Sequence, residues 1–221
     1  QGQLFPLLAK QPLYQKFLCG GNHTEPHHGL LEQCHDLIIN MPRPASLHWN
    51  RALVTAGVAR PWEQQQQQGA AGGVRRDILV SYIGRGAAPD SSRWAVQDMC
   101  NRYNESSNVV CRGYSNCSQA YEIKARSVFC LDPAGDSPGR RSTIDSYAVG
   151  CIPVFLGIVQ AFLYPELWTG WHDSAFLVLD EVRVREGKDD IVKLLEAVPK
   201  SAVEHMQAQI AKYAPRFLYN E

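Results

Sequence analysis

The chain has 221 residues, of which 45% are hydrophobic and 20% are charged, an ordinary globular composition that can bury one sizeable α/β core. Its 22 lysines and arginines balance its 22 aspartates and glutamates, so no global positive charge attracts nucleic acid or an anionic membrane, and we expect no nucleic-acid partner. Any site for an anion must therefore be local. No apolar run approaches the roughly 20 residues of a membrane span, and the first residues lack the pattern of a signal peptide.

The seven cysteines form no CxxC pair and no Cys/His set with zinc spacing, so we expect no bound metal. Three N-glycosylation sequons begin at Asn22, Asn104 and Asn116. Together, the sequons and the number of cysteines favour a lumenal protein in which some cysteines pair over a cytosolic protein with free thiols. Because the count is odd, at least one thiol stays free or pairs with a segment beyond this sequence.

A low-complexity stretch divides the chain. Residues 63–73 consist mostly of glutamine, glycine and alanine, which predicts a flexible linker. Residues 1–62 contain one apolar run, 36–42, that is typical of a single buried strand. After the linker, strand and helix patterns alternate, which is typical of βαβ units around a parallel sheet.

In chain order, the second part predicts the following elements. Apolar runs indicate strands at 77–84, 108–111, 127–131, 151–156 and 175–179. Periodic patterns and capping residues indicate helices from the N-cap candidates at 90–92 to about 103, at 117–125, at 138–149 with Gly150 to end it, at 188–198 and at 201–214. The order predicts a Rossmann-like α/β domain.

The segment 132–143 is the strongest candidate for a binding site. It connects the end of a predicted strand to the start of a predicted helix, where open parallel sheets place their ligands. The helix N-terminus offers unpaired N–H groups, glycines allow a ligand to approach the backbone, and two adjacent arginines suit a pyrophosphate. One turn further, a carboxylate could accept bonds from ribose hydroxyls. The candidate residues are Gly135, Asp136, Ser137, Arg140, Arg141, Ser142 and Asp145.

An alternative explanation is that Arg140 and Arg141 only form ion pairs with Asp136 and Asp145 on a solvated helix end. The glycine- and serine-rich context after a buried strand favours the binding site over this alternative.

These residues resemble the signature of the exostosin-like glycosyltransferases, closest to the plant xyloglucan galactosyltransferase branch. The similarity rests on SVFCLDPAGDSPGRRSTIDS at 127–146 and GCIPVF at 150–155, and extends more weakly over about 74–219. Asp132, Ala134 and the pair Pro138-Gly139 depart from the usual pattern of that branch.

The resemblance implies the two-lobed GT-B fold, of which residues 74–221 would form the C-terminal lobe that binds a nucleotide sugar, together with its C-terminal helices. Residues 1–62 would be the end of the N-terminal, acceptor-binding lobe. It also implies inverting transfer of a galactose-like sugar from a UDP-sugar to a hydroxyl of a polysaccharide or glycoprotein glycan, without a cofactor or metal. Protein donors, with Arg140, Arg141 and the Ser137 loop as candidates, would then stabilise the leaving UDP.

No residue of this sequence is assigned as the catalytic base, which we expect from the missing part of the first lobe. The resemblance further implies a type II membrane protein of the Golgi lumen, with its membrane anchor upstream of this sequence. A non-catalytic nucleotide- or carbohydrate-binding remnant is the alternative function. A phosphate-transferring enzyme is disfavoured, because no GxxxxGK[ST] loop is present.

Two further features have open explanations. Trp168 and Trp171 could stack on a sugar or uracil ring or could anchor the core, with equal support. Asp180 and Glu181 follow a predicted strand, where they could contact the donor sugar, but such an acidic pair is more often the start of a helix.

Overall fold

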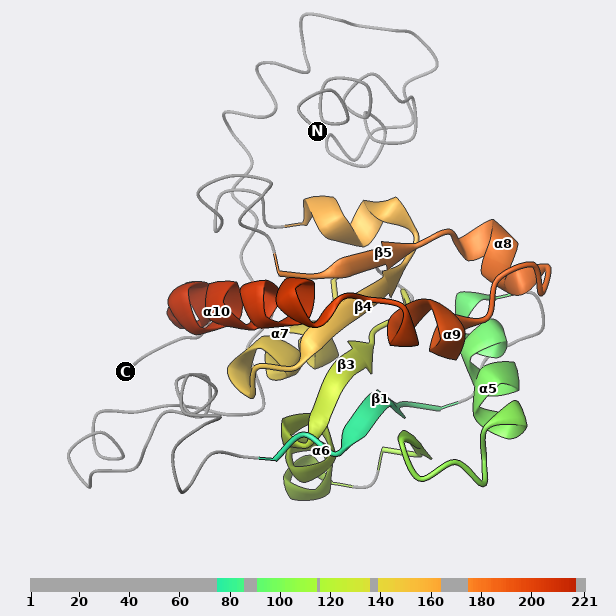
Figure 1. The fold of residues 1–221 in the computed structure, drawn as a ribbon, viewed down its shortest axis with the longest axis horizontal. Helices are drawn as coiled ribbons and strands as arrows, with labels where there is room; N and C mark the ends of the chain where they lie inside the picture. The colour runs from blue at the N-terminus through green and yellow to red at the C-terminus, as the bar shows by residue number, and fades with distance from the viewer. Residues whose placement is uncertain (1–74, 86–90, 115, 136–138, 164–174, 218–221) are drawn as a thin grey trace, which may run out of the picture. The chain divides into compact units, whose positions relative to one another are not determined.

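The computed structural model describes residues 75–85, 91–114, 116–135, 139–163 and 175–217. These residues form one parallel sheet with helices on both faces (Figure 1). The five strands are β1 (Ile78–Ile83), β2 (Val109–Arg112), β3 (Ser127–Leu131), β4 (Ile152–Leu156) and β5 (Leu177–Leu179). The prediction of an α/β domain around a parallel sheet is therefore confirmed.

The strand order β2-β1-β3-β4-β5 creates a point where the chain changes direction across the sheet. The chain steps from β1 outward to β2 and then crosses back over β1 to reach β3, so β1 pairs with both, with Val80 opposite Val109 on one side and Phe129 on the other. Right-handed crossovers place the connections on opposite faces, and a crevice opens between them at the carboxyl ends of β1 and β3.

The helices cover the sheet in two sets. On the side of the main core, α9 (Ile191–Glu196) contacts β1, and α10 (Lys200–Phe217) contacts β4 and α7 (Arg141–Ala148). Helix α5 (Ser92–Arg102) contacts β2 and α8 (Glu181–Arg185). Helix α6 (Cys117–Ala125) contacts β1, β3 and α7. Figure 1 shows α9 and α10 lying across one face of the sheet. A short 3-10 helix, η2 (Ile158–Phe162), follows β4.

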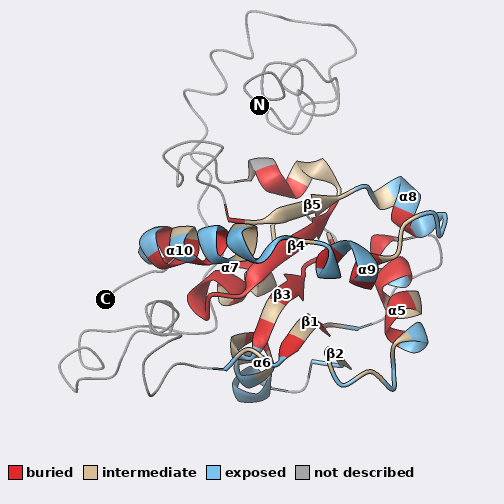
Figure 2. Ribbon diagram, in the orientation of Figure 1, coloured by how far each residue is buried: buried red, intermediate tan, exposed pale blue. Residues whose placement is uncertain are grey.

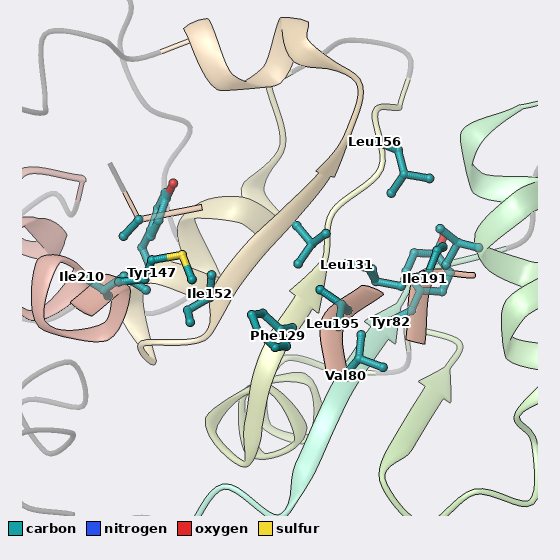
Figure 3. Packing of buried hydrophobic residues seen from close by; sticks show 14 of the residues in the cluster. Val80, Tyr82, Phe129, Leu131, Tyr147, Ile152, Leu156, Ile191, Leu195 and Ile210 are labelled. Atoms are coloured by element: carbon teal, nitrogen blue, oxygen red, sulfur yellow. The ribbon is translucent and has the colours of Figure 1, made fainter. Parts of the chain in front are cut away.

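The main core lies between the sheet and the α5, α9 and α10 side. β4 is buried along its whole length (Figure 2). Figure 3 shows Ile191 and Leu195 of α9 beside Val80 and Tyr82 of β1, all of which belong to one buried cluster. Burial of each such side chain stabilises the fold by roughly 1.5–3 kcal/mol. Packing on this face therefore holds in place the strands whose carboxyl ends border the crevice.

The opposite face contains a smaller cluster and a disulfide. Cys130 of β3 and Cys151 are joined there, next to Tyr121 and Ala125 of α6. A second disulfide joins Cys100 of α5 to Cys111 of β2. The prediction that some cysteines pair is thus confirmed for four of them, whereas Cys117 carries a free, exposed thiol and Cys19 and Cys34 lie outside the described residues.

Most element boundaries agree with the sequence, and the differences have local causes. The helix predicted at 138–149 begins at Arg141, because Arg140 is extended with φ −130° and ψ 141°. It ends as predicted, since Gly150 adopts φ 69°. The helix predicted at 188–198 covers Ile191–Glu196, because the Asp190 side chain caps it. The 3-10 helix η2 was not predicted, and α8 was anticipated only as a helix that the acidic pair at 180–181 would begin.

Asp180 and Glu181 are the acidic pair that the sequence predicted to begin a helix, and Asp180 does cap one. Its side chain accepts hydrogen bonds from the backbone N–H groups of Val182 and Arg183, at 3.0 and 3.1 Å, and so begins α8. The structure therefore confirms the predicted helix start at this position, and the sugar contact stays a prediction. Within the described part of the chain, no helix is long and apolar enough to cross a membrane.

Candidate functional site

A cavity of about 570 Å³ opens at the carboxyl ends of β1, β2 and β3, within the range of volumes common for small-molecule sites. Its position agrees with the rule that open α/β sheets bind ligands where the strand order reverses. Among its lining residues, Asp145 is the one acidic side chain, and five are cationic: Arg85, Arg93, Lys124, Arg140 and Arg141. The cavity therefore presents a local excess of positive charge in a chain that has none overall.

The N-terminus of α7 forms one wall of this cavity. Gly139, Arg140, Arg141 and Ser142 all line it. No side chain among the described residues caps α7, whereas Asn116 caps α6 with a hydrogen bond of 2.9 Å from the Gln119 N–H. The first N–H groups of α7 are thus available beside the cavity, and the partial positive charge of the helix end adds to that of the arginines.

Two guanidinium groups are held against the loop that follows β3. Arg140 Nη1 donates to the Pro133 carbonyl at 2.8 Å, and Arg93 Nε donates to the Ala134 carbonyl at 3.1 Å. Arg93 also lies directly over Gly135, where an added Cβ would be only 2.1 Å from Nη2. Each guanidinium has five N–H donors, so these single bonds orient the group and leave most donors for a ligand.

A buried ion pair lies beneath the α7 terminus. Lys124 of α6 is 4% exposed and Asp132 is 1% exposed, with 3.7 Å between Lys124 Nζ and Asp132 Oδ1. Nζ also donates to the Ser142 carbonyl at 2.7 Å and to the hydroxyls of Ser142 and Ser146 at 2.8 and 2.7 Å. Ser146 in turn donates to Asp132 Oδ2 at 2.9 Å.

This network connects three elements and holds the first turn of α7 in place. Burial lowers the pKa of the Lys124 ammonium, while the nearby Asp132 carboxylate opposes that shift. Gln160 of η2 supports the same loop from the other side, by donating to the Asp132 carbonyl at 2.8 Å. The cavity wall is therefore fixed before any ligand binds, which limits the entropy lost on binding.

The structure brings together five of the seven residues predicted from the sequence: Gly135, Arg140, Arg141, Ser142 and Asp145 all line the cavity. Asp136 and Ser137 lie outside the described residues. Asp145 Oδ1 accepts a hydrogen bond of 2.7 Å from the Tyr121 hydroxyl. Arg140 donates to the Pro133 carbonyl. The alternative in which Arg140 and Arg141 pair with Asp136 and Asp145 stays untested, because Asp136 lies outside the described residues.

Among the cavity-lining residues that sequence reasoning missed, the cationic and aromatic ones are Arg85, Arg93, Tyr114 and Lys124. Arg93 could have been found, because it is the second residue of the helix that follows β1 and so occupies a position similar to that of Ser142 in α7. Lys124 gave no signal, since a lysine in the last turn of a helix is ordinary. Trp168, Trp171 and the strand predicted at 36–42 lie outside the described residues.

The described residues contain no group of three or more His, Cys, Asp and Glu side chains that could hold a metal ion. The cationic groups instead come from arginine and lysine, which bind phosphate through N–H donors. The fold and the cavity together define an α/β domain with a cationic cavity at its switch point.

The chain matches the family model of the exostosin GT47 domain over residues 27–193, and it therefore belongs to this family. It is 33% identical over 157 residues to the xyloglucan galactosyltransferase MUR3 of Arabidopsis thaliana, covering 66% of this chain and 25% of that protein. It is 38% identical over 106 residues to xyloglucan-specific galacturonosyltransferase 1 of the same plant, covering 43% of this chain and 15% of that protein. The predicted resemblance to the exostosin-like family and its plant xyloglucan branch is confirmed.

The chain thus spans a quarter or less of the length of these two relatives. Among solved structures, one similar chain is an alpha-glucosyltransferase in complex with UDP-glucose and DNA containing an abasic site, at 14% identity and a TM-score of 0.40, covering 73% of this chain and 45% of that one.

Proposed function

We propose that the full-length protein is an inverting glycosyltransferase that moves a galactose-like sugar from a UDP-sugar to a hydroxyl of a glycan, in cell-wall polysaccharide or glycoprotein glycan synthesis. The described domain would bind the UDP-sugar, as the C-terminal lobe of a GT-B fold. The observation that carries the proposal is the cationic cavity at the switch point, where the arginines and the uncapped end of α7 face one space. Membership of the exostosin GT47 family supports it.

The arginines would act on the leaving group. As the bond from the sugar to the diphosphate breaks, negative charge grows on the UDP oxygens, and donors already aimed at that position lower the barrier. Arg93 and Arg140 are oriented by the Ala134 and Pro133 carbonyls, so they need little reorganisation. Arg141 is exposed at the α7 terminus and can contact the outer phosphate.

Asp145 is the candidate to accept hydrogen bonds from the ribose hydroxyls. The Tyr121 hydroxyl donates to Oδ1 at 2.7 Å and so helps to hold this carboxylate in the cavity wall. No described residue is assigned as the base that deprotonates the acceptor, which we expect outside this domain. The donor sugar stays open, since the relatives are named for galactosyl and galacturonosyl transfer.

We also propose that the full-length protein is a type II membrane protein of the Golgi lumen. Two disulfides support an oxidising compartment. Asn104 and Asn116, which begin two of the sequons, are exposed and hence accessible to a glycosylating enzyme. Digestion of the protein from plant membranes with an N-glycosidase tests this: a loss of apparent mass is expected, and unchanged mass with protease sensitivity in intact vesicles would contradict it.

Titration of the full-length protein with UDP tests the binding proposal. Arg141→Ala should weaken UDP binding by about 1.5–3 kcal/mol, the usual range for a lost charge-assisted hydrogen bond. Arg185→Ala is the matched control, because Arg185 is equally exposed and does not line the cavity. Unchanged UDP affinity in Arg141→Ala would contradict the assignment of the site.

Transfer of labelled sugar from UDP-galactose to xyloglucan tests the activity. Transfer by the full-length protein is expected. UDP binding without transfer to any hydroxyl acceptor would instead support the non-catalytic alternative.

A further inference from the structure

Tyr114 is an exposed aromatic residue in the wall of the cationic cavity. It follows β2, and 48% of its surface is accessible to solvent. An aromatic ring in the wall of a concave site presents a face on which a planar ligand group can pack. Trp94 on α5 is similarly exposed, at 42%, but does not line the cavity. Tyr114 thus supplies a free ring beside charged groups that suit a diphosphate.

The strand order determines which way a nucleotide can extend from the α7 terminus. The described residues that line the cavity follow β1, β2 and β3 or belong to α5, α6 and α7, and none comes from β4 or β5. Among the described residues, the lining extends from α7 across β1 toward β2, and this gives the nucleoside of a diphosphate held beside α7 a path in that direction. That path spans two strand spacings, roughly 10 Å, and ends at Tyr114.

The Tyr114 ring is also held in place. Its hydroxyl is 3.0 Å from Sγ of Cys117, the first residue of α6, and this contact raises the pKa of Tyr114. Arg141 and Asp145 are close enough to act electrostatically on the same phenol. The ring, the candidate ribose acceptor and a candidate phosphate donor therefore surround one space.

We infer that the Tyr114 ring is the surface on which the base of the bound nucleotide stacks, with Cys117 fixing the orientation of the ring. This inference rests on the proposed function, because it requires that the cavity binds a nucleoside diphosphate. Stacking is sequence-tolerant and uses the π face that every base presents, so Tyr114 would add affinity for the nucleoside, while the arginines bind the phosphates.

Comparing UDP with inorganic pyrophosphate separates the two contributions, because pyrophosphate has no base. In the full-length protein, Tyr114→Ala should weaken UDP binding about 5- to 150-fold, the range for loss of one base–aromatic stack, and leave pyrophosphate affinity unchanged. Tyr114→Leu keeps apolar bulk but lacks the π face, and should show the same selective loss. Tyr114→Phe keeps the π face but loses the hydroxyl contact with Cys117, so it should bind UDP more tightly than Tyr114→Ala and less tightly than the unmodified protein. Trp94→Ala should change neither affinity.

The outcomes also distinguish the inference from the proposed function. If Arg141→Ala weakens both ligands while Tyr114→Ala changes neither, the diphosphate site stands and the stacking inference is overturned. Equal loss of UDP and pyrophosphate in Tyr114→Ala also overturns it, since Tyr114 would then act on the phosphates or on the loop. If the unmodified protein binds neither ligand, both ideas fail. Thermal melting of each variant shows that it is folded.

Discussion

Gly135 offers a way to move one guanidinium without removing it. In Gly135→Ala, the new Cβ would lie 2.1 Å from Arg93 Nη2, so the guanidinium must retreat by about 1.3 Å to reach the 3.4 Å of an ordinary contact. The displaced atom is the end of a flexible side chain, and Gly135 does not have a positive φ, so the backbone tolerates alanine. The change therefore acts on the cavity rather than on the fold.

We expect Gly135→Ala to lower the free energy of unfolding slightly and the affinity for UDP more strongly. Retreat of Arg93 breaks its 3.1 Å bond to the Ala134 carbonyl, and a half-exposed hydrogen bond of this kind contributes about 1 kcal/mol to stability at most. Losing a charge-assisted contact to a phosphate costs about 1.5–3 kcal/mol. That loss corresponds to roughly 10- to 150-fold weaker UDP binding.

Titration calorimetry with UDP at constant ionic strength, together with thermal melting, measures both effects. Gly113→Ala is the matched control, because a Cβ there meets no atom within 4 Å. If Gly135 acts through Arg93, then Arg93→Ala should match the loss in Gly135→Ala, and the double variant should lose little more. Additive losses, or full UDP affinity in a folded Gly135→Ala protein, would refute the reasoning.

Three other predictions concern the stability of the fold rather than ligand binding. Lys124→Met should lower the free energy of unfolding in urea by about 3–5 kcal/mol, because it leaves Asp132 buried without its counter-charge, and adding Asp132→Asn should recover part of the loss. Replacing Cys100 and Cys111 together by serine should cost about 3 kcal/mol in the same assay, because their disulfide closes a short loop. Burial alone would raise the pKa of Asp190, but bonds from Tyr103, the α9 backbone and Arg102 hold it below its usual value. Since a depressed carboxylate pKa stabilises the fold only when the group is ionised, this contribution should be complete above about pH 4 and disappear as the pH falls further, and Asp190→Asn should lack it.

A specific result would contradict each of these three predictions. A double Lys124 and Asp132 variant as unstable as the sum of the two single variants would show that the pair is not coupled. A reductant-insensitive melting temperature would contradict the disulfide prediction. An Asp190→Asn protein that loses stability in acid as steeply as the unmodified protein would contradict the pH prediction.

The elements of the fold could be predicted where their signals are local. β3 and α6 begin and end at the predicted residues, because an apolar run and a capping asparagine mark them within a few positions. Gly150 likewise marks the end of α7 through its own φ. The cysteine pairs could not be predicted, because Cys100 meets Cys111 only once α5 and β2 lie side by side, and sequence spacing does not define that neighbour.

The residues of the candidate site also fall into two groups, those that a local pattern marks and those whose place depends on the fold. Arg140 and Arg141 could be predicted because the loop, the helix start and the arginines are contiguous. Tyr114 could not, since its place beside α7 depends on β2 pairing with β1, which no local pattern encodes. Lys124 and Asp132 required the packing of α6 beneath α7, and neither residue type indicates a buried pair from sequence alone.

The way in which the arginines are held explains how a chain of zero net charge can bind an anion at one place. On the surface, Arg102 and Arg183 are paired with carboxylates, so an incoming anion would have to compete for them. In the cavity, Arg93 and Arg140 are held by backbone carbonyls instead, which are neutral and fix geometry without cancelling charge. In the proposed site, no described carboxylate pairs with these two guanidiniums, so a diphosphate would not have to displace one from them.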